Sequence, residues 1–94
     1  MKCSDINYYL FSIVNISEDS GLNAEYENKL FKSHDTALEY MEKAIEAELS
    51  AYADNHYDMN ELTIERIGTN MVNLWLTREH TEAVLYRISN IRPI

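Results

Sequence analysis

The stretch of sequence that decides the fold reads SHDTALEYMEKAIEAELSAY and runs from Ser33 to Tyr52. Its apolar side chains recur at steps of three and four residues, which is the spacing that places them on one side of an α-helix. Serine favours the start of a helix, and neither glycine nor proline interrupts the stretch. We therefore predict one amphipathic helix, with an apolar stripe formed by Leu38, Met41, Ile45, Leu49 and Tyr52.

Acidic side chains form a second stripe along one flank of the same helix. They step by four, three and four residues and are Asp35, Glu39, Glu42 and Glu46. Like charges at this spacing mildly destabilise a helix, so these residues add nothing to the folding of the element that carries them. The acidic stripe is either a solvated surface or a surface that binds a partner.

The negative charge of the chain is concentrated in one segment. The chain has 94 residues and a net charge of −8, of which −7 lies between Asp35 and Glu61, where eight acids accompany one base, Lys43. Contacts with nucleic-acid phosphates or with anionic lipids need clustered lysine and arginine. We therefore expect neither direct nucleic-acid binding nor attachment to a membrane.

Length and cysteine content indicate the broad class of protein. Ninety-four residues are enough for one globular domain, so we predict a single domain over residues 1–94. The lone cysteine, Cys3, cannot form an internal disulfide, which fits a reducing compartment, and we expect the cytoplasm. No apolar run approaches the roughly 20 residues that span a membrane.

Five further stretches predict β-strands, because they alternate apolar and polar residues or are rich in aromatic and β-branched ones. They are residues 8–16, 25–32, 62–67, 71–77 and 82–88. With the helix between the second and third, the element order is β-β-α-β-β-β. This order predicts an α+β fold, in which a single-layer, mostly antiparallel sheet carries one amphipathic helix packed across one face.

The helix cannot cover the whole of such a sheet. A helix is about 10 Å wide and strands lie about 4.8 Å apart, so it covers two or three strands of five. Yet residues 8–16, 71–77 and 82–88 carry apolar side chains at both alternating positions. A homodimer or another protein partner is expected to cover the second face, unless the sheet curls around the helix.

The second half of the chain carries the residue types that anchor protein interfaces. Tryptophan, tyrosine and arginine are enriched at such anchors. We predict that partner-binding side chains on the sheet are Trp75, Tyr86, Arg66 and Arg87, with the arginines available to meet the acidic helix of a second subunit. In an alternative reading, Trp75 packs under the helix of its own chain.

Two alternative functions use the acidic segment. Carboxylates spaced along a helix imitate the row of phosphates on a nucleic-acid strand, so the acidic stripe could occupy a nucleic-acid-binding partner. Residues 54–61, DNHYDMNE, place potential metal ligands at alternate positions, and Glu65 stands at the twelfth position of a calcium loop, although a histidine, His56, occupies the third position. However, Met59 occupies the position where a calcium loop needs glycine, so a polar connection is the simpler interpretation.

Glu48 stands on the apolar side of the predicted helix. A carboxylate there either needs an arginine partner, such as Arg66 or Arg87, or reaches water beyond the sheet edge.

The sequence gives little sign of catalysis. It contains neither a glycine-rich phosphate loop nor a local arrangement of nucleophile, histidine and acid. We expect a small, acidic, non-enzymatic protein without a cofactor. It acts by protein–protein interaction as an accessory, regulatory or inhibitory module, and it associates with itself.

Overall fold

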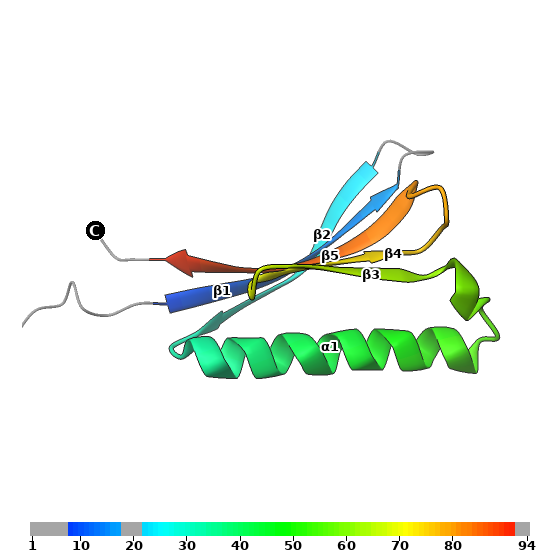
Figure 1. Cartoon of the computed structure of the whole chain (residues 1–94). Coiled ribbons are helices and arrows are strands. Elements are labelled where there is room, and N and C mark those ends of the chain that lie inside the picture. The colour runs from blue at the N-terminus through cyan, green and yellow to red at the C-terminus, as the bar shows by residue number, and fades with distance from the viewer. Residues whose placement is uncertain (1–7, 18–21, 92–94) are drawn as a thin grey trace, which may run out of the picture.

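The computed structural model describes residues 8–17 and 22–91 and confirms the predicted α+β fold (Figure 1). One long helix packs against an open antiparallel sheet of five strands. The elements in chain order are β1 (Tyr8–Ser17), β2 (Leu22–Phe31), α1 (His34–Asp54), a short 3-10 helix η2 (Met59–Glu61), β3 (Thr63–Ile67), β4 (Met71–Trp75) and β5 (Glu82–Ile91).

The strands lie in the order β2-β1-β5-β4-β3, and every neighbouring pair is antiparallel. The hairpin β1–β2 forms one side of the sheet and the hairpin β3–β4 forms the other. α1 connects β2 at one edge to β3 at the opposite edge, and β5 closes the sheet by pairing with both β1 and β4. β1 is an interior strand, as its mixed apolar pattern predicts.

The helix α1 confirms the prediction made from residues 33–52 and extends it by two residues. Ser33 is the N-cap, and its hydroxyl accepts a hydrogen bond from the backbone N–H of Thr36 at 3.4 Å. Met41 and Ile45 are buried, and the other members of the apolar stripe pack against the core half-buried. Asn55 ends the helix by donating its backbone N–H to the carbonyl of Ala51.

Strand ends differ from the prediction where pairing, rather than hydrophobicity, decides them. β5 continues through the polar residues 89–90 because they pair with β1, where Tyr8 lies opposite Ile91. β4 stops at Trp75, since the hydroxyl of Thr77 accepts the backbone N–H of Thr81 and turns the chain. Cys3 and residues 18–21, which lie between the first two predicted strands, are outside the described residues.

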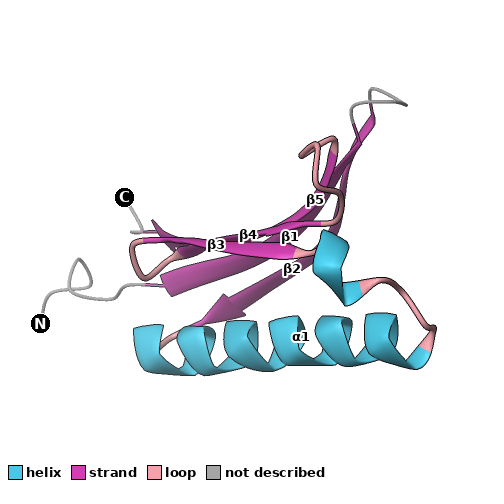
Figure 2. Ribbon diagram, turned by 45° about the vertical axis from the view of Figure 1, so that its right-hand side comes forward, coloured by secondary structure: helices cyan, strands magenta, loops and turns pink. Residues whose placement is uncertain are grey.

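The core lies between α1 and one face of the sheet (Figure 2). Phe11 is 0% exposed at its centre, with its ring edge-on to Tyr40 at 5.3 Å and stacked on Tyr86 at 6.5 Å. The remaining buried members from the sheet and the helix are Ile13, Val72, Leu74, Val84, Ile88, Ala37, Met41 and Ile45.

In the part of the chain that the structure describes, no helix combines the length and the hydrophobicity needed to cross a membrane.

Candidate functional site

No described helix covers the face of the sheet opposite α1 (Figure 2). We call it the open face. It takes the alternate side chains of each strand, because neighbours along a strand point to opposite sides. Its apolar members are Tyr8, Leu10, Val14, Ile16, Leu30, Ile67, Met71, Trp75, Ala83, Leu85 and Ile91.

Several of these apolar side chains are in contact with solvent. Leu30 is 59% exposed, Ile67 44% and Ile91 40%, while Val14 and Leu85 at the centre are half-buried by their neighbours alone. Large exposed apolar surfaces are uncommon on monomeric proteins. The sequence-based expectation of a second apolar face is therefore met by the described structure.

The strand register separates the four side chains predicted to bind a partner on the sheet. Trp75 pairs with Ala83 and Arg87 pairs with Met71, which places both on the open face. Tyr86 pairs with Val72 and points under the helix, where it is 1% exposed. Tyr86 is thus a core residue rather than a surface anchor, and Trp75 does not pack under the helix.

A polar cluster lies on the β3–β4 side of the open face. One carboxylate oxygen of Glu65, Oε1, accepts hydrogen bonds from Nδ2 of Asn73 at 3.0 Å and from Nε1 of Trp75 at 3.2 Å. The ring of His80 stacks on Trp75 with centroids 4.4 Å apart. The two hydrogen bonds, with the charge of nearby His80, lower the pKa of Glu65. Glu65 is therefore a fixed negative charge on the open face.

Arg87 supplies a positive charge on the central strand of the same face. It is exposed and lies in register with Ser12 of β1 and Met71 of β4. Its side chain makes no hydrogen bond or ion pair among the described residues. An unpaired guanidinium amid apolar side chains is available to a carboxylate of a partner.

Arg66 lies on the helix side of β3 and pairs with the acidic stripe of its own chain. Its two terminal nitrogens donate to the two carboxylate oxygens of Glu42, at 2.8 and 3.0 Å. This bidentate contact lowers the pKa of Glu42 and raises the pKa of Arg66. The other stripe members, Asp35, Glu39 and Glu46, are exposed. Arg66 therefore meets an acidic helix as predicted, but within one chain.

The Glu42–Arg66 pair predicts a small, pH-dependent contribution to stability. Because the pKa of Glu42 is lowered on folding, the contribution is present above the pKa of an unfolded glutamate and is lost as the pH falls through the folded value. Both side chains are about half exposed, so screening limits the effect to about 0.5 kcal/mol. Glu42→Gln should lose this amount at neutral pH and match the parent in acid, as measured by urea unfolding.

A neighbouring glutamate provides the matched control. Glu46 belongs to the same acidic stripe but makes no ion pair among the described residues. Glu46→Gln should leave stability unchanged or raise it by a few tenths of a kcal/mol, because it removes a like charge four residues from Glu42. A larger loss in this variant than in Glu42→Gln would contradict the assignment of the pair.

The segment considered as a metal loop, residues 54–61, uses its polar groups for structure. Asp58 caps η2 by accepting the backbone N–H of Asn60 at 3.0 Å. Glu61 pairs with Nε of Arg78 at 2.5 Å, and the hydroxyl of Tyr57 donates to the carbonyl of Leu76. No group of three or more potential ligand side chains gathers around one point in the described residues. The geometry favours the polar-connection interpretation.

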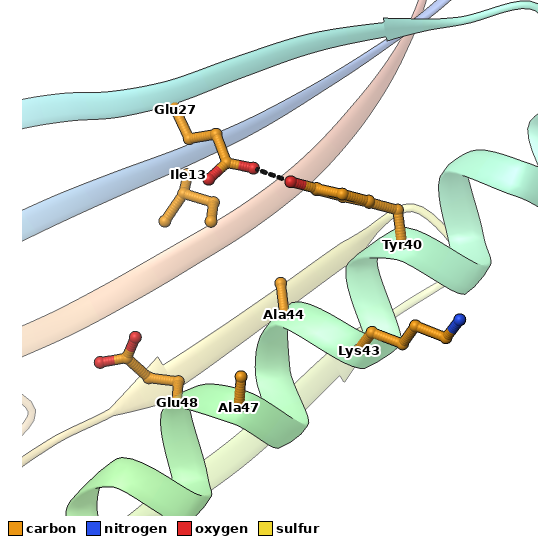
Figure 3. A pocket seen from close by; sticks show the side chains of 7 residues that line it. All are labelled: Ile13, Glu27, Tyr40, Lys43, Ala44, Ala47 and Glu48. Carbon is orange, nitrogen blue, oxygen red and sulfur yellow. Dashed lines mark hydrogen bonds between the residues drawn. The ribbon is translucent and has the colours of Figure 1, made fainter.

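A hollow of about 430 Å³ lies where the β1–β2 hairpin and α1 diverge (Figure 3). The hydroxyl of Tyr40 donates to Glu27 across it at 2.8 Å, and this bond raises the pKa of Tyr40. Glu48 is half-buried at its side and has neither Arg66 nor Arg87 as a partner. The remaining lining residues are Ile13, Ala44 and Ala47, which are apolar, and Lys43, which points outward. The hollow holds no arrangement of nucleophile and base among the described residues.

Sequence reasoning missed Glu65 and Asn73 as members of the site, although a signal for them exists. Gly68-Thr69-Asn70 predicts a turn centred on Thr69, and this centre sets Glu65 opposite Asn73.

Comparisons with protein-family models, with curated proteins and with solved structures return no match for this chain. Its function is therefore inferred from the geometry of the described residues.

Proposed function

We propose that this protein is a binding module rather than an enzyme, and that it works by protein–protein interaction through the open face, with a second copy of itself as the partner. One observation carries the proposal: a sheet face without a helix over it, to which all five strands contribute apolar side chains, with polar side chains such as Ser12, Asn73 and Ser89 between them. Covering that face removes apolar surface from water, which is the main driving force of association.

The size of the face suits a stable interface. Five strands about 4.8 Å apart, each five to ten residues long at about 3.3 Å per residue, give roughly 400–800 Å². A standard protein interface buries about 800 Å² on each partner. The open face is therefore large enough to support a dimer, whereas a small isolated patch would not be.

The charge distribution favours a second copy over an unrelated partner. Among the strand residues whose side chains the structure describes, Arg87 and Glu65 are the charged members of the open face, and Glu25 of β2 is in register there opposite Val14. Because Arg87 and Glu65 have opposite signs, two copies can be arranged with unlike charges facing each other. The acidic stripe lies on α1, on the other side of the sheet. Sheets stacked about 10 Å apart, with a helix about 10 Å outside each, keep the two stripes roughly 30 Å apart. That distance exceeds the screening length of about 8 Å at physiological salt.

Pairing through the edge strand β3 is a less favourable way to self-associate. A twofold axis at the middle of β3 joins the strand to its copy with Glu65 opposite Glu65. Like charges directly opposite each other destabilise a strand pair. In this fully overlapping register the charge of Glu65 opposes edge pairing.

Sedimentation velocity over the micromolar range tests the proposal. We expect a reversible monomer–dimer equilibrium, with amide hydrogen exchange slowed in β4, β5 and β1 as the dimer forms. A monomer at every concentration would overturn self-association. A dimer whose protection falls on β3 alone, or on α1, would place the interface elsewhere.

A further inference from the structure

Two oppositely charged side chains of the open face, Arg87 and Glu65, lie two strands apart. Arg87 is on β5, β4 comes next, and Glu65 is on β3. Arg87 is in register with Met71 and Ile67, and Glu65 lies two residues before Ile67. At about 4.8 Å between strands and 3.3 Å along them, the two Cα atoms are roughly 12 Å apart, too far for an ion pair within one chain.

We infer that two copies join by their open faces in one particular register, in which Arg87 of each copy pairs with Glu65 of the other. This inference rests on the self-association proposed above and adds the position of the symmetry axis. The twofold axis lies in the plane between the two stacked sheets. It crosses β4 between Met71 and Asn73, midway between Arg87 and Glu65 of one copy. One twofold rotation about it then forms both ion pairs.

Glu65 and Arg87 can both form the proposed ion pair without breaking an existing contact. Glu65 is held by Asn73 and Trp75 through Oε1, which leaves Oε2 to accept from a guanidinium. Arg87 has no partner in the described part of its own chain, so pairing breaks no existing contact. A carboxylate fixed by two donors loses little side-chain entropy when it binds, which favours a specific contact.

The same rotation brings apolar side chains together. If each sheet is treated as flat, with the strand and residue spacings given above, the rotation places Met71 next to Ile67 of the second copy. It also places Val14 next to Trp75 of the second copy. An axis placed over β5 at Arg87 would instead oppose two unpaired guanidinium groups, which is unfavourable. Charge and hydrophobic contact thus select the same axis.

Charge reversal tests the register. Arg87→Glu alone and Glu65→Arg alone should each raise the dimer dissociation constant by roughly 10- to 100-fold, because each opposes like charges. In a mixed dimer, one copy carries an acid at both positions and the other copy carries a base at both, so each of the two contacts joins opposite charges. The mixture should therefore dimerise with an affinity within about threefold of the parent.

Three controls separate this inference from folding effects and from the proposed function. Lys43→Glu and Glu39→Arg make the same charge changes at exposed positions of α1, away from the open face, and should dimerise like the parent, alone or mixed. Glu65→Gln keeps an oxygen for Asn73 and Trp75 without the charge and should weaken the dimer less than Glu65→Arg. Circular dichroism melts establish that each variant is folded.

The outcomes are distinct. Restored dimerisation in the mixture alone supports the register. A parent dimer that survives both single reversals, or variants that fail to recover on mixing, overturns the register but leaves self-association standing. A monomeric parent overturns both.

Discussion

Replacing Phe11 by alanine is expected to lower the free energy of unfolding by about 3–5 kcal/mol, because it leaves a cavity at the centre of the core. Phe11 is 0% exposed and its ring contacts Tyr40 from the helix and Tyr86 from β5. A domain of this size has a stability of about 5–10 kcal/mol, so the variant should be near the limit of folding. Urea unfolding followed by far-ultraviolet circular dichroism measures the loss.

Leu30→Ala is the control for this substitution. Leu30 is an apolar strand residue on the neighbouring strand, yet it is 59% exposed, so its truncation should cost less than about 1 kcal/mol. Both variants must be compared at one protein concentration, because dimerisation makes apparent stability concentration-dependent. Equal losses in the two variants would contradict the placement of the core on the helix side of the sheet.

Replacing Leu85 by aspartate is expected to convert the dimer to a monomer while the fold persists. Leu85 lies on β5 at the centre of the open face, between Val14 of β1 and Asn73 of β4. In the dimer an unpaired carboxylate at this position would be removed from water, so we expect the dissociation constant to rise at least about 100-fold. In the monomer the side chain remains partly exposed, and the charge stays hydrated.

Asn90→Asp is the matched control for Leu85→Asp. It adds the same charge to the same strand, but at an exposed position on the opposite side of β5. Sedimentation velocity should show a dimer for Asn90→Asp and a monomer for Leu85→Asp, with both variants folded by circular dichroism. If Leu85→Asp dimerises as well as the parent, the open face is not the interface.

The helix and the strands of the fold can be predicted from local patterns in the sequence. Steps of three and four residues among Leu38, Met41 and Ile45 define α1, and Ser33 marks its start as predicted. Alternation and aromatic content locate the five strands, and their order around one helix leaves few arrangements other than the observed sheet.

The candidate site is less predictable, because it depends on register. Trp75 and Tyr86 both lie in strands with apolar residues at both alternating positions, so hydrophobicity alone cannot assign them to a face. Pairing of Val72 with Tyr86 decides that Tyr86 is buried. Likewise, the Glu42–Arg66 contact joins residues 24 positions apart and requires the path of α1 relative to β3, which no local pattern encodes.

The central position of β5 has a consequence for the synthesis of the protein. β5 is the last described strand to leave the ribosome, yet it alone joins β1 to β4. Until it emerges, the nascent chain consists of two separate hairpins and a helix, with Phe11 lacking the ring of Tyr86 beside it. Pairing between β1 and β5 closes most of the chain into one loop, a contact of high sequence separation that slows folding. The sheet is therefore completed only after β5 has emerged, and until then the first hairpin is exposed to aggregation.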